Sequence, residues 1–92
     1  MSSEGVKSID RRVASRIRER RLQVGMTQQQ LAELIGVAFQ QAHKYERGIS
    51  RITAGRLYYI AAALQTPVSY FFAPTEGPDH RGSPEGKASD EG

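Results

Sequence analysis

The chain has 92 residues, no cysteine and a net charge of +3, and 38% of its residues are hydrophobic. This length fits one domain with a modest core, and the lack of cysteine excludes a disulfide framework and a cysteine-based zinc site. No run of about 18 apolar residues occurs and Met1 to Ile9 lacks the apolar segment of a signal peptide, so we expect a cytoplasmic protein without membrane contact.

Positive charge is concentrated in the middle of the chain. Residues 9–72 carry ten Lys or Arg and four Asp or Glu, whereas residues 73–92 carry two and five. A basic module with an acidic tail suits a polyanionic partner, although a well-solvated surface would look similar. The tail, with four Gly and three Pro, is predicted to be disordered, and residues 1–8 are predicted to be flexible. One folded domain, 9–72, is therefore expected.

The first predicted helix runs from Ile9 to about Val24 and ends at Gly25. Its apolar face carries Ile9, Val13, Ile17 and Val24. The other faces are rich in arginine, and we expect one or two of these side chains to contact phosphate while the rest are solvated. They are Arg11, Arg12, Arg16, Arg18 and Arg20.

The second predicted helix has the sharpest start signal. Thr27 and Gln30 form a capping box, in which each side chain satisfies a free backbone N–H of the other residue. The helix then runs from Gln28 to about Ile35 and is ended by Gly36.

Three further helices complete the pattern. The third follows Val37 and ends near Arg47, and the fourth is capped by Thr53. Thr66 and Pro67 form a cap and first position for a short fifth helix. Strand signals are poor, so the fold class is predicted to be all-α, a compact five-helix domain.

Two helices joined by a short glycine turn indicate a helix-turn-helix. Ala32 is small where the two helices should cross, and Gly36 can adopt the positive φ that the turn needs. Apolar residues at matching places supply a shared core: Leu31, Ile35, Val37, Ala42 and Tyr45.

The segment from Arg16 to Phe72 resembles the Cro/repressor-type helix-turn-helix family, also called the Xre family. The motifs that carry the resemblance are RIRERR from Arg16, GMTQQQLAELIGV from Gly25, KYERGISRI from Lys44 and LYYIAAALQTPVSYFF from Leu57. The resemblance implies a DNA-binding domain whose third helix enters the major groove of double-stranded DNA.

The resemblance also implies site residues. Base edges would be read by Phe39, Gln40, His43 and Lys44, and phosphates would be bound by Gln28, Gln41, Arg47 and Arg51. Glutamine can pair with adenine and lysine can donate to guanine, which supports part of this assignment. Gln40 and His43 could instead be ordinary surface residues, and Phe39 could equally belong to the core.

Ala38 departs from the family pattern, in which many relatives have Ser or Thr. Alanine cannot cap the third helix with a side-chain oxygen. The resemblance further implies an ion pair of Arg21 with Glu46, which would tie the first helix to the third. The alternative is two separate surface charges.

A single domain touches too few base pairs to find one site among millions, so a two-fold homodimer on a palindromic operator is expected. Adjacent helical side chains point about 100° apart, so one of Phe71 and Phe72 should enter the core while the other meets its twin. Alternatively, both rings close the core. The candidate interface consists of Val68, Tyr70, Phe71 and Phe72.

These patterns favour a sequence-specific transcriptional regulator from a bacterium or phage. An alternative is the antitoxin of a toxin–antitoxin pair, whose tail binds a partner protein, and a third reading is an adaptor that has lost DNA contact. No nucleophile constellation, carboxylate pair or phosphate-binding loop is present, so we expect neither enzyme activity nor a cofactor or metal.

Overall fold

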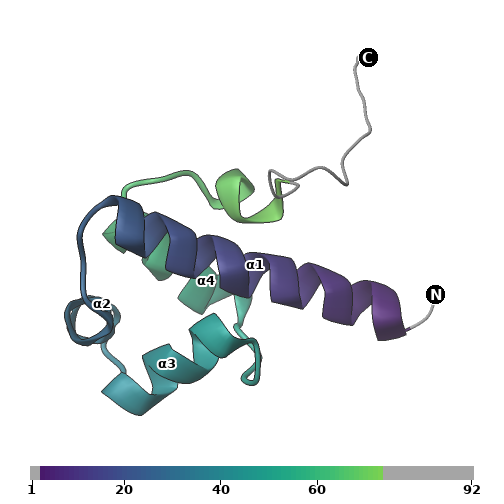
Figure 1. Ribbon diagram of the computed structural model, residues 1–92, viewed down its shortest axis with the longest axis horizontal. Coiled ribbons are helices and arrows are strands. Elements are labelled where there is room, and N and C mark those ends of the chain that lie inside the picture. Colours follow the sequence, from purple (N-terminus) through teal and green to yellow (C-terminus); the bar gives the residue numbers. More distant parts are fainter. Residues whose placement is uncertain (1–2, 74–92) are drawn as a thin grey trace.

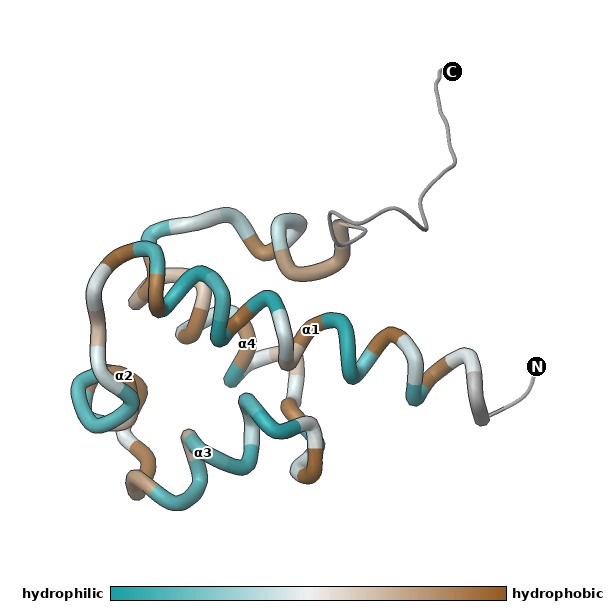
Figure 2. The backbone as a smooth tube through the Cα atoms, in the orientation of Figure 1, coloured by the Kyte–Doolittle hydropathy of each residue, from teal (hydrophilic) through white to brown (hydrophobic). Residues whose placement is uncertain are grey.

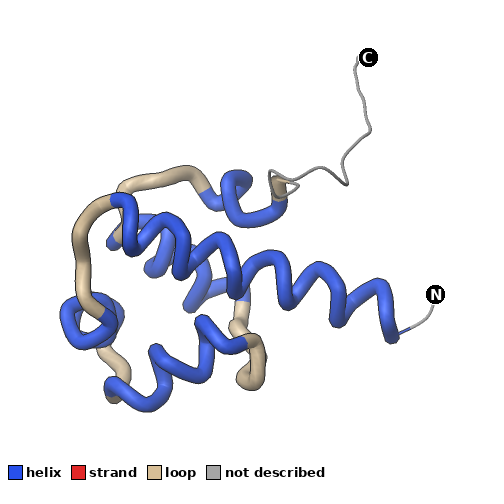
Figure 3. Tube along the Cα trace, in the orientation of Figure 1, coloured by secondary structure: helices blue, strands red, loops and turns tan. Residues whose placement is uncertain are grey.

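The computed structural model describes residues 3–73, which form four α-helices and a short 3-10 helix without any strand (Figures 1 and 3). The elements are α1 (Ser3–Gln23), α2 (Gln28–Ile35), α3 (Phe39–Arg47), α4 (Ala54–Ala63) and η1 (Val68–Phe72). The all-α prediction is therefore confirmed. Within this range no helix is both long enough and apolar enough to cross a bilayer. The predicted disordered tail lies outside the described residues from position 74 onward.

Helix α1 begins at Ser3, six residues before the predicted start, so the stretch predicted to be flexible is helical from there on. The apolar pattern could not reveal this start because residues 5–9 are all exposed, and in Figure 1 the start of α1 projects beyond the other helices. Ile9 is 45% exposed, contrary to its predicted place on the buried face. Val24 lies in the turn after α1 and is also exposed. Adding residues to an existing helix needs no new nucleus, which accounts for the extension.

The caps of α2 and α4 confirm the local signals in the sequence. Thr27 Oγ1 accepts a hydrogen bond from the Gln30 N–H at 3.0 Å, and Gln30 Oε1 accepts from the Thr27 N–H at 2.8 Å. Thr53 Oγ1 accepts from the Arg56 N–H at 3.2 Å. Gly36 ends α2 with φ of 76°, a left-handed conformation that costs glycine little.

Helix α3 starts without a side-chain cap, as the alanine at position 38 predicted. It ends at Gly48, which has φ of 73°. A Cβ atom placed on Gly48 would lie 3.6 Å from the Cβ atom of Ala14, an ordinary van der Waals contact. Because the left-handed φ favours glycine, this residue sets where α3 stops.

The predicted fifth α-helix is a 3-10 helix of five residues, η1. Pro67, and not Thr66, occupies its cap position, and no side chain caps it. A segment this short gains few α-helical hydrogen bonds, so the tighter 3-10 turn is the expected outcome when packing decides. The count of five helices is thus corrected to four α-helices and one 3-10 helix.

The core lies where all five elements meet. Its largest fully buried side chains come from four elements: Ile17, Leu31, Ile60 and Phe71, with Leu64 directly after α4. Val37, predicted to be in the core, is only partly buried and packs against it. Leu34 of α2 is 61% exposed.

A buried ion pair connects α1 to α3. Arg21 Nε lies 2.6 Å from Glu46 Oε2, and Arg21 Nη2 donates to Glu46 Oε1 at 3.0 Å. The third nitrogen, Nη1, donates to the Met26 carbonyl at 2.8 Å. The side chains are 9% and 1% exposed, so the two are a buried bidentate pair and not two surface charges.

Three arginines on another side of α1 bind the carbonyls of the segment that follows α4. Arg20 Nε donates to the Leu64 carbonyl at 2.9 Å and its Nη2 to the Gln65 carbonyl at 3.2 Å. Arg16 Nε donates to the Tyr70 carbonyl at 3.3 Å, and its guanidinium lies 4.2 Å from the centre of the Tyr70 ring. Arg12 Nη1 reaches the carbonyl of residue 72 at 3.4 Å. These arginines hold η1 against α1.

We predict that Arg21 and Glu46 are strongly coupled in stability. Glu46→Ala should lower the free energy of unfolding by about 3–5 kcal/mol because it leaves a buried guanidinium without its partner. A double-mutant cycle from urea unfolding should give an interaction of about 0.5–3 kcal/mol. The same cycle on Arg16 and Glu19 is a matched control, because Glu19 is 47% exposed and should couple by less than about 1 kcal/mol. Additive effects at the buried pair would contradict this role.

Candidate nucleic-acid interface

Helix α3 has two sharply different sides. Ala42, Tyr45 and Glu46 are buried against the other helices. At 3.6 residues per turn, the side chains of the opposite side cover an arc of about 140°. All of them are exposed, and they are Phe39, Gln40, His43, Lys44 and Arg47. The structure therefore brings the four predicted base-reading residues and one predicted phosphate ligand onto one surface, here called the α3 face.

The α3 face is polar and basic. It carries the cations Lys44 and Arg47, and the only carboxylate of α3, Glu46, is turned inward and paired. In Figure 2 most of α3 has the hydrophilic colour, whereas α4 is mixed with hydrophobic segments. An exposed helical surface with donors, cations and no carboxylate offers suitable groups for base edges and phosphates.

Phe39 and His43 form one unit on the α3 face. Their ring centroids are 6.4 Å apart and the ring planes differ by 25°, a stacked arrangement one helical turn apart. Phe39 is 43% exposed, which resolves the alternative between core and surface in favour of the surface. An exposed aromatic ring at the start of α3 can make apolar contact with a thymine methyl group.

Gln28, predicted to bind phosphate, is part of a network inside the protein. Its Nε2 donates to Glu46 Oε1 at 3.0 Å, and its Oε1 lies 3.3 Å from Nδ1 of His43. The network runs from the buried Arg21 through Glu46 to an exposed residue of the α3 face. Sequence reasoning missed it, because the partners of Gln28 are 15 and 18 residues away and only the fold brings them together.

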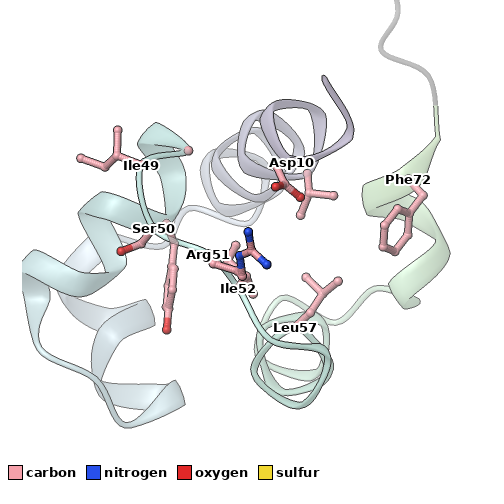
Figure 4. Close-up of a pocket in the computed structure, with 10 residues that line it drawn as sticks. Asp10, Ile49, Ser50, Arg51, Ile52, Leu57 and Phe72 are labelled. Atoms are coloured by element: carbon pink, nitrogen blue, oxygen red, sulfur yellow. The ribbon is translucent and has the colours of Figure 1, made fainter. Parts of the chain in front are cut away.

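The two remaining predicted phosphate ligands, Gln41 and Arg51, lie next to the α3 face. Gln41 is half-buried at its edge, and Arg51 is exposed in the loop after α3. Arg51 also lines a pocket of about 220 Å³ between α1, the loop and η1 (Figure 4). Asp10 and Phe72 lie on other walls of this pocket.

The candidate dimer residues have unequal exposure. Phe71 is fully buried, so it cannot itself form an interface and must be removed from the predicted set. Phe72 is 45% exposed. Val68 and Tyr70 are half-buried and pack against the core. The adjacent rings thus point in different directions, one inward and one outward.

Four arginines of α1 bind other parts of the protein. The sequence analysis expected this of only one of them. Arg21 binds Glu46, as the resemblance implied. The other three bind backbone carbonyls of the C-terminal segment, although they were expected to be solvated or to contact phosphate. They are Arg12, Arg16 and Arg20. Their spacing of four residues was visible, but the partners lie 44 to 60 residues away and gave no local signal.

Comparison with known proteins places this geometry in context. A transcriptional regulator encoded in the ATPase CF(0) region of Rhodospirillum rubrum is 49% identical over 76 residues, covering 83% of this chain and 70% of that protein. Six further relatives named HTH-type transcriptional regulators are 46–51% identical. The chain spans only 46–54% of their length.

Solved structures share the fold. The restriction-modification controller protein C.AhdI from Aeromonas hydrophila matches with a TM-score of 0.65 and 27% identity, over 67% of this chain and 94% of that one. Hydroxypropylphosphonic acid epoxidase from S. wedmorenis matches with a TM-score of 0.66 and 29% identity, over 71% of this chain but only 35% of the enzyme. The fold therefore occurs both alone and as a part of larger proteins.

The model of the helix-turn-helix family HTH_3 matches residues 17–71, which include α2, α3, the turn between them, α4, most of η1 and the last third of α1. The resemblance noted in the sequence and the observed geometry agree with this match. The chain belongs to the Cro/C1-type helix-turn-helix family, the Xre family of DNA-binding proteins.

Proposed function

We propose that this protein regulates transcription by binding a specific DNA site as a two-fold dimer, with α3 in the major groove. The observation that carries the proposal is the α3 face, an exposed polar and basic surface on a helix whose only carboxylate is buried and paired. The relatives named as transcriptional regulators support the same role. The site of action would be the bacterial cytoplasm, where the chromosome is accessible.

The proposed contacts divide into two classes. Gln40, His43 and Lys44 would read base edges, because their exposed side chains carry hydrogen-bonding groups, and Phe39 would contact a methyl group. Phosphate contacts would come from the exposed cations Arg47 and Arg51, with Gln41 beside them. Gln28 would reach phosphate only by giving up a contact within the protein, so it is the weakest member of the phosphate set.

The proposed dimer uses Phe72. This side chain lies beside the loop that follows α3, since both line the same pocket. A two-fold axis near this surface would place one α3 on either side of it. Two half-sites roughly 34–36 Å apart would then be read together.

Gln40→Ala should weaken binding to the preferred site by about 1–3 kcal/mol and relax the preference at one base pair, because a paired base edge loses its partner. The matched control is Gln29→Ala, which removes an exposed amide from α2, outside the α3 face. Competition titrations with specific and random DNA measure both effects. Equal weakening on the two DNAs would remove Gln40 from the base-reading set.

Arg51→Ala should weaken all DNA sequences alike and reduce the slope of log affinity against log salt by about 1 per subunit, because one phosphate contact is lost. Arg12→Ala removes the same charge from the side of α1 that holds η1, and should leave the slope unchanged. Binding isotherms across a salt series give the slopes. An unchanged slope for Arg51→Ala would show that this arginine points away from DNA.

Phe72→Ala should weaken cooperative binding to a palindrome while leaving the core intact, because the ring is half exposed whereas Phe71 is buried. Tyr59→Ala, at an aromatic residue of α4 that is 61% exposed, should have no such effect. Sedimentation with whole palindromes and single half-sites measures the stoichiometry. Full cooperativity in Phe72→Ala would place the interface elsewhere, and one chain bound to an asymmetric site would end the dimer proposal.

A further inference from the structure

The imidazole of His43 is held on two sides. Nδ1 faces Gln28 Oε1 at 3.3 Å, and the ring stacks on Phe39 with a centroid distance of 6.4 Å. The side chain is nevertheless exposed, and among the described residues it has no other hydrogen-bond partner. Nε2 lies on the other side of the ring, so it is the nitrogen available to a ligand on the α3 face.

The orientation of the Gln28 amide follows from its other partner. Nε2 of Gln28 donates to Glu46 Oε1 at 3.0 Å. A carboxylate can only accept, so exchanging the amide N and O would bring two oxygens together. Glu46 cannot turn away, because Arg21 binds both of its oxygens. The amide oxygen of Gln28 must therefore face His43.

This geometry determines which nitrogen of His43 carries hydrogen. An amide oxygen only accepts, so a hydrogen bond across the 3.3 Å contact requires hydrogen on Nδ1. A neutral imidazole has one N–H, so Nε2 then has a lone pair and can only accept. Among the bases, adenine and cytosine present amino groups in the major groove, whereas guanine and thymine present carbonyl oxygens.

We propose that Gln28 holds His43 in the Nδ1–H tautomer, so that His43 selects adenine or cytosine through Nε2. Gln28 is then a positioning residue that sets a base preference without touching the base. The base-reading half of this proposal rests on the proposed function, whereas the tautomer is a property of the free protein. Without the Gln28 oxygen, Nε2 could carry the hydrogen and would suit guanine or thymine.

The tautomer is tested in the full-length protein without DNA. With His80→Ala, His43 is the only histidine, and ¹⁵N–¹H correlation of its ring, followed to rising pH until its chemical shifts no longer change, reports the neutral form. We expect the chemical shift of an unprotonated nitrogen at Nε2. Hydrogen on Nε2 in this protein would overturn the proposal, whatever the variants do.

Two glutamine variants test the cause. Gln28→Leu should move hydrogen to Nε2, whereas Gln29→Leu, which removes an amide bonded to Glu33 and not to His43, should leave the tautomer unchanged. The backbone amide spectrum shows whether each variant is folded. An unchanged tautomer in folded Gln28→Leu would overturn the positioning role.

Selection from random DNA at the same pH tests the reading. At the base pair whose preference disappears in His43→Ala, any Watson–Crick pair presents one amino group and one carbonyl oxygen in the major groove, so base analogues that lack one or the other identify the group that Nε2 contacts. We expect removal of the adenine or cytosine amino group to weaken binding by about two- to tenfold, the range of one hydrogen bond. Gln28→Leu should lose this effect and Gln29→Leu should keep it. An effect from removing the guanine or thymine carbonyl oxygen instead would overturn the reading. Absence of any sequence-specific binding would overturn the proposed function, while the NMR result would still decide the tautomer.

Discussion

The contact on which the rest of the structure depends is the buried pair of Arg21 and Glu46. Each donor nitrogen of Arg21 has a partner, two on Glu46 and one on the Met26 carbonyl. The guanidinium therefore joins α1 to α3 and to the turn that leads into α2. Burying two charges has a large desolvation cost, so such a pair adds little net stability. Its contribution is geometric, because a bidentate pair permits only a narrow range of orientations of α3 on α1.

Net charge is a poor guide to where this protein would contact DNA. Most of the arginines lie on α1, yet four of them bind other parts of the protein, three through backbone carbonyls. These carbonyls belong to a segment with little regular hydrogen bonding of its own, so the arginines replace contacts that a longer helix would provide. Three exposed cations lie on α3 and the loop after it, namely Lys44, Arg47 and Arg51.

The sequence predicted the features that neighbouring residues determine. The capping box of Thr27 and the left-handed turn at Gly36 depend on contacts within four residues, and both are observed. The 3-10 form of η1 and the partners of Gln28 depend on residues brought together by folding, and neither was predicted. The early start of α1 was missed for another reason, since its first turns have no buried face to produce a pattern. For the α3 face, the resemblance supplied the positions and the structure supplied their exposure.

The α3 face and the core of this domain are chemically connected, not separate layers. Glu46 Oε1 accepts hydrogen bonds from both Arg21 and Gln28. This one oxygen therefore connects the Arg21–Glu46 pair, which orients α3, to the Gln28 amide, which faces His43. A change at Gln28 would thus alter an exposed side chain while leaving every residue of α3 unchanged. Two members of this family with identical third helices could then differ in base preference if their second helices differ. Comparing only the residues that contact bases would miss such a difference, because its cause is a residue that is hydrogen-bonded to a base-reading side chain and does not contact the base.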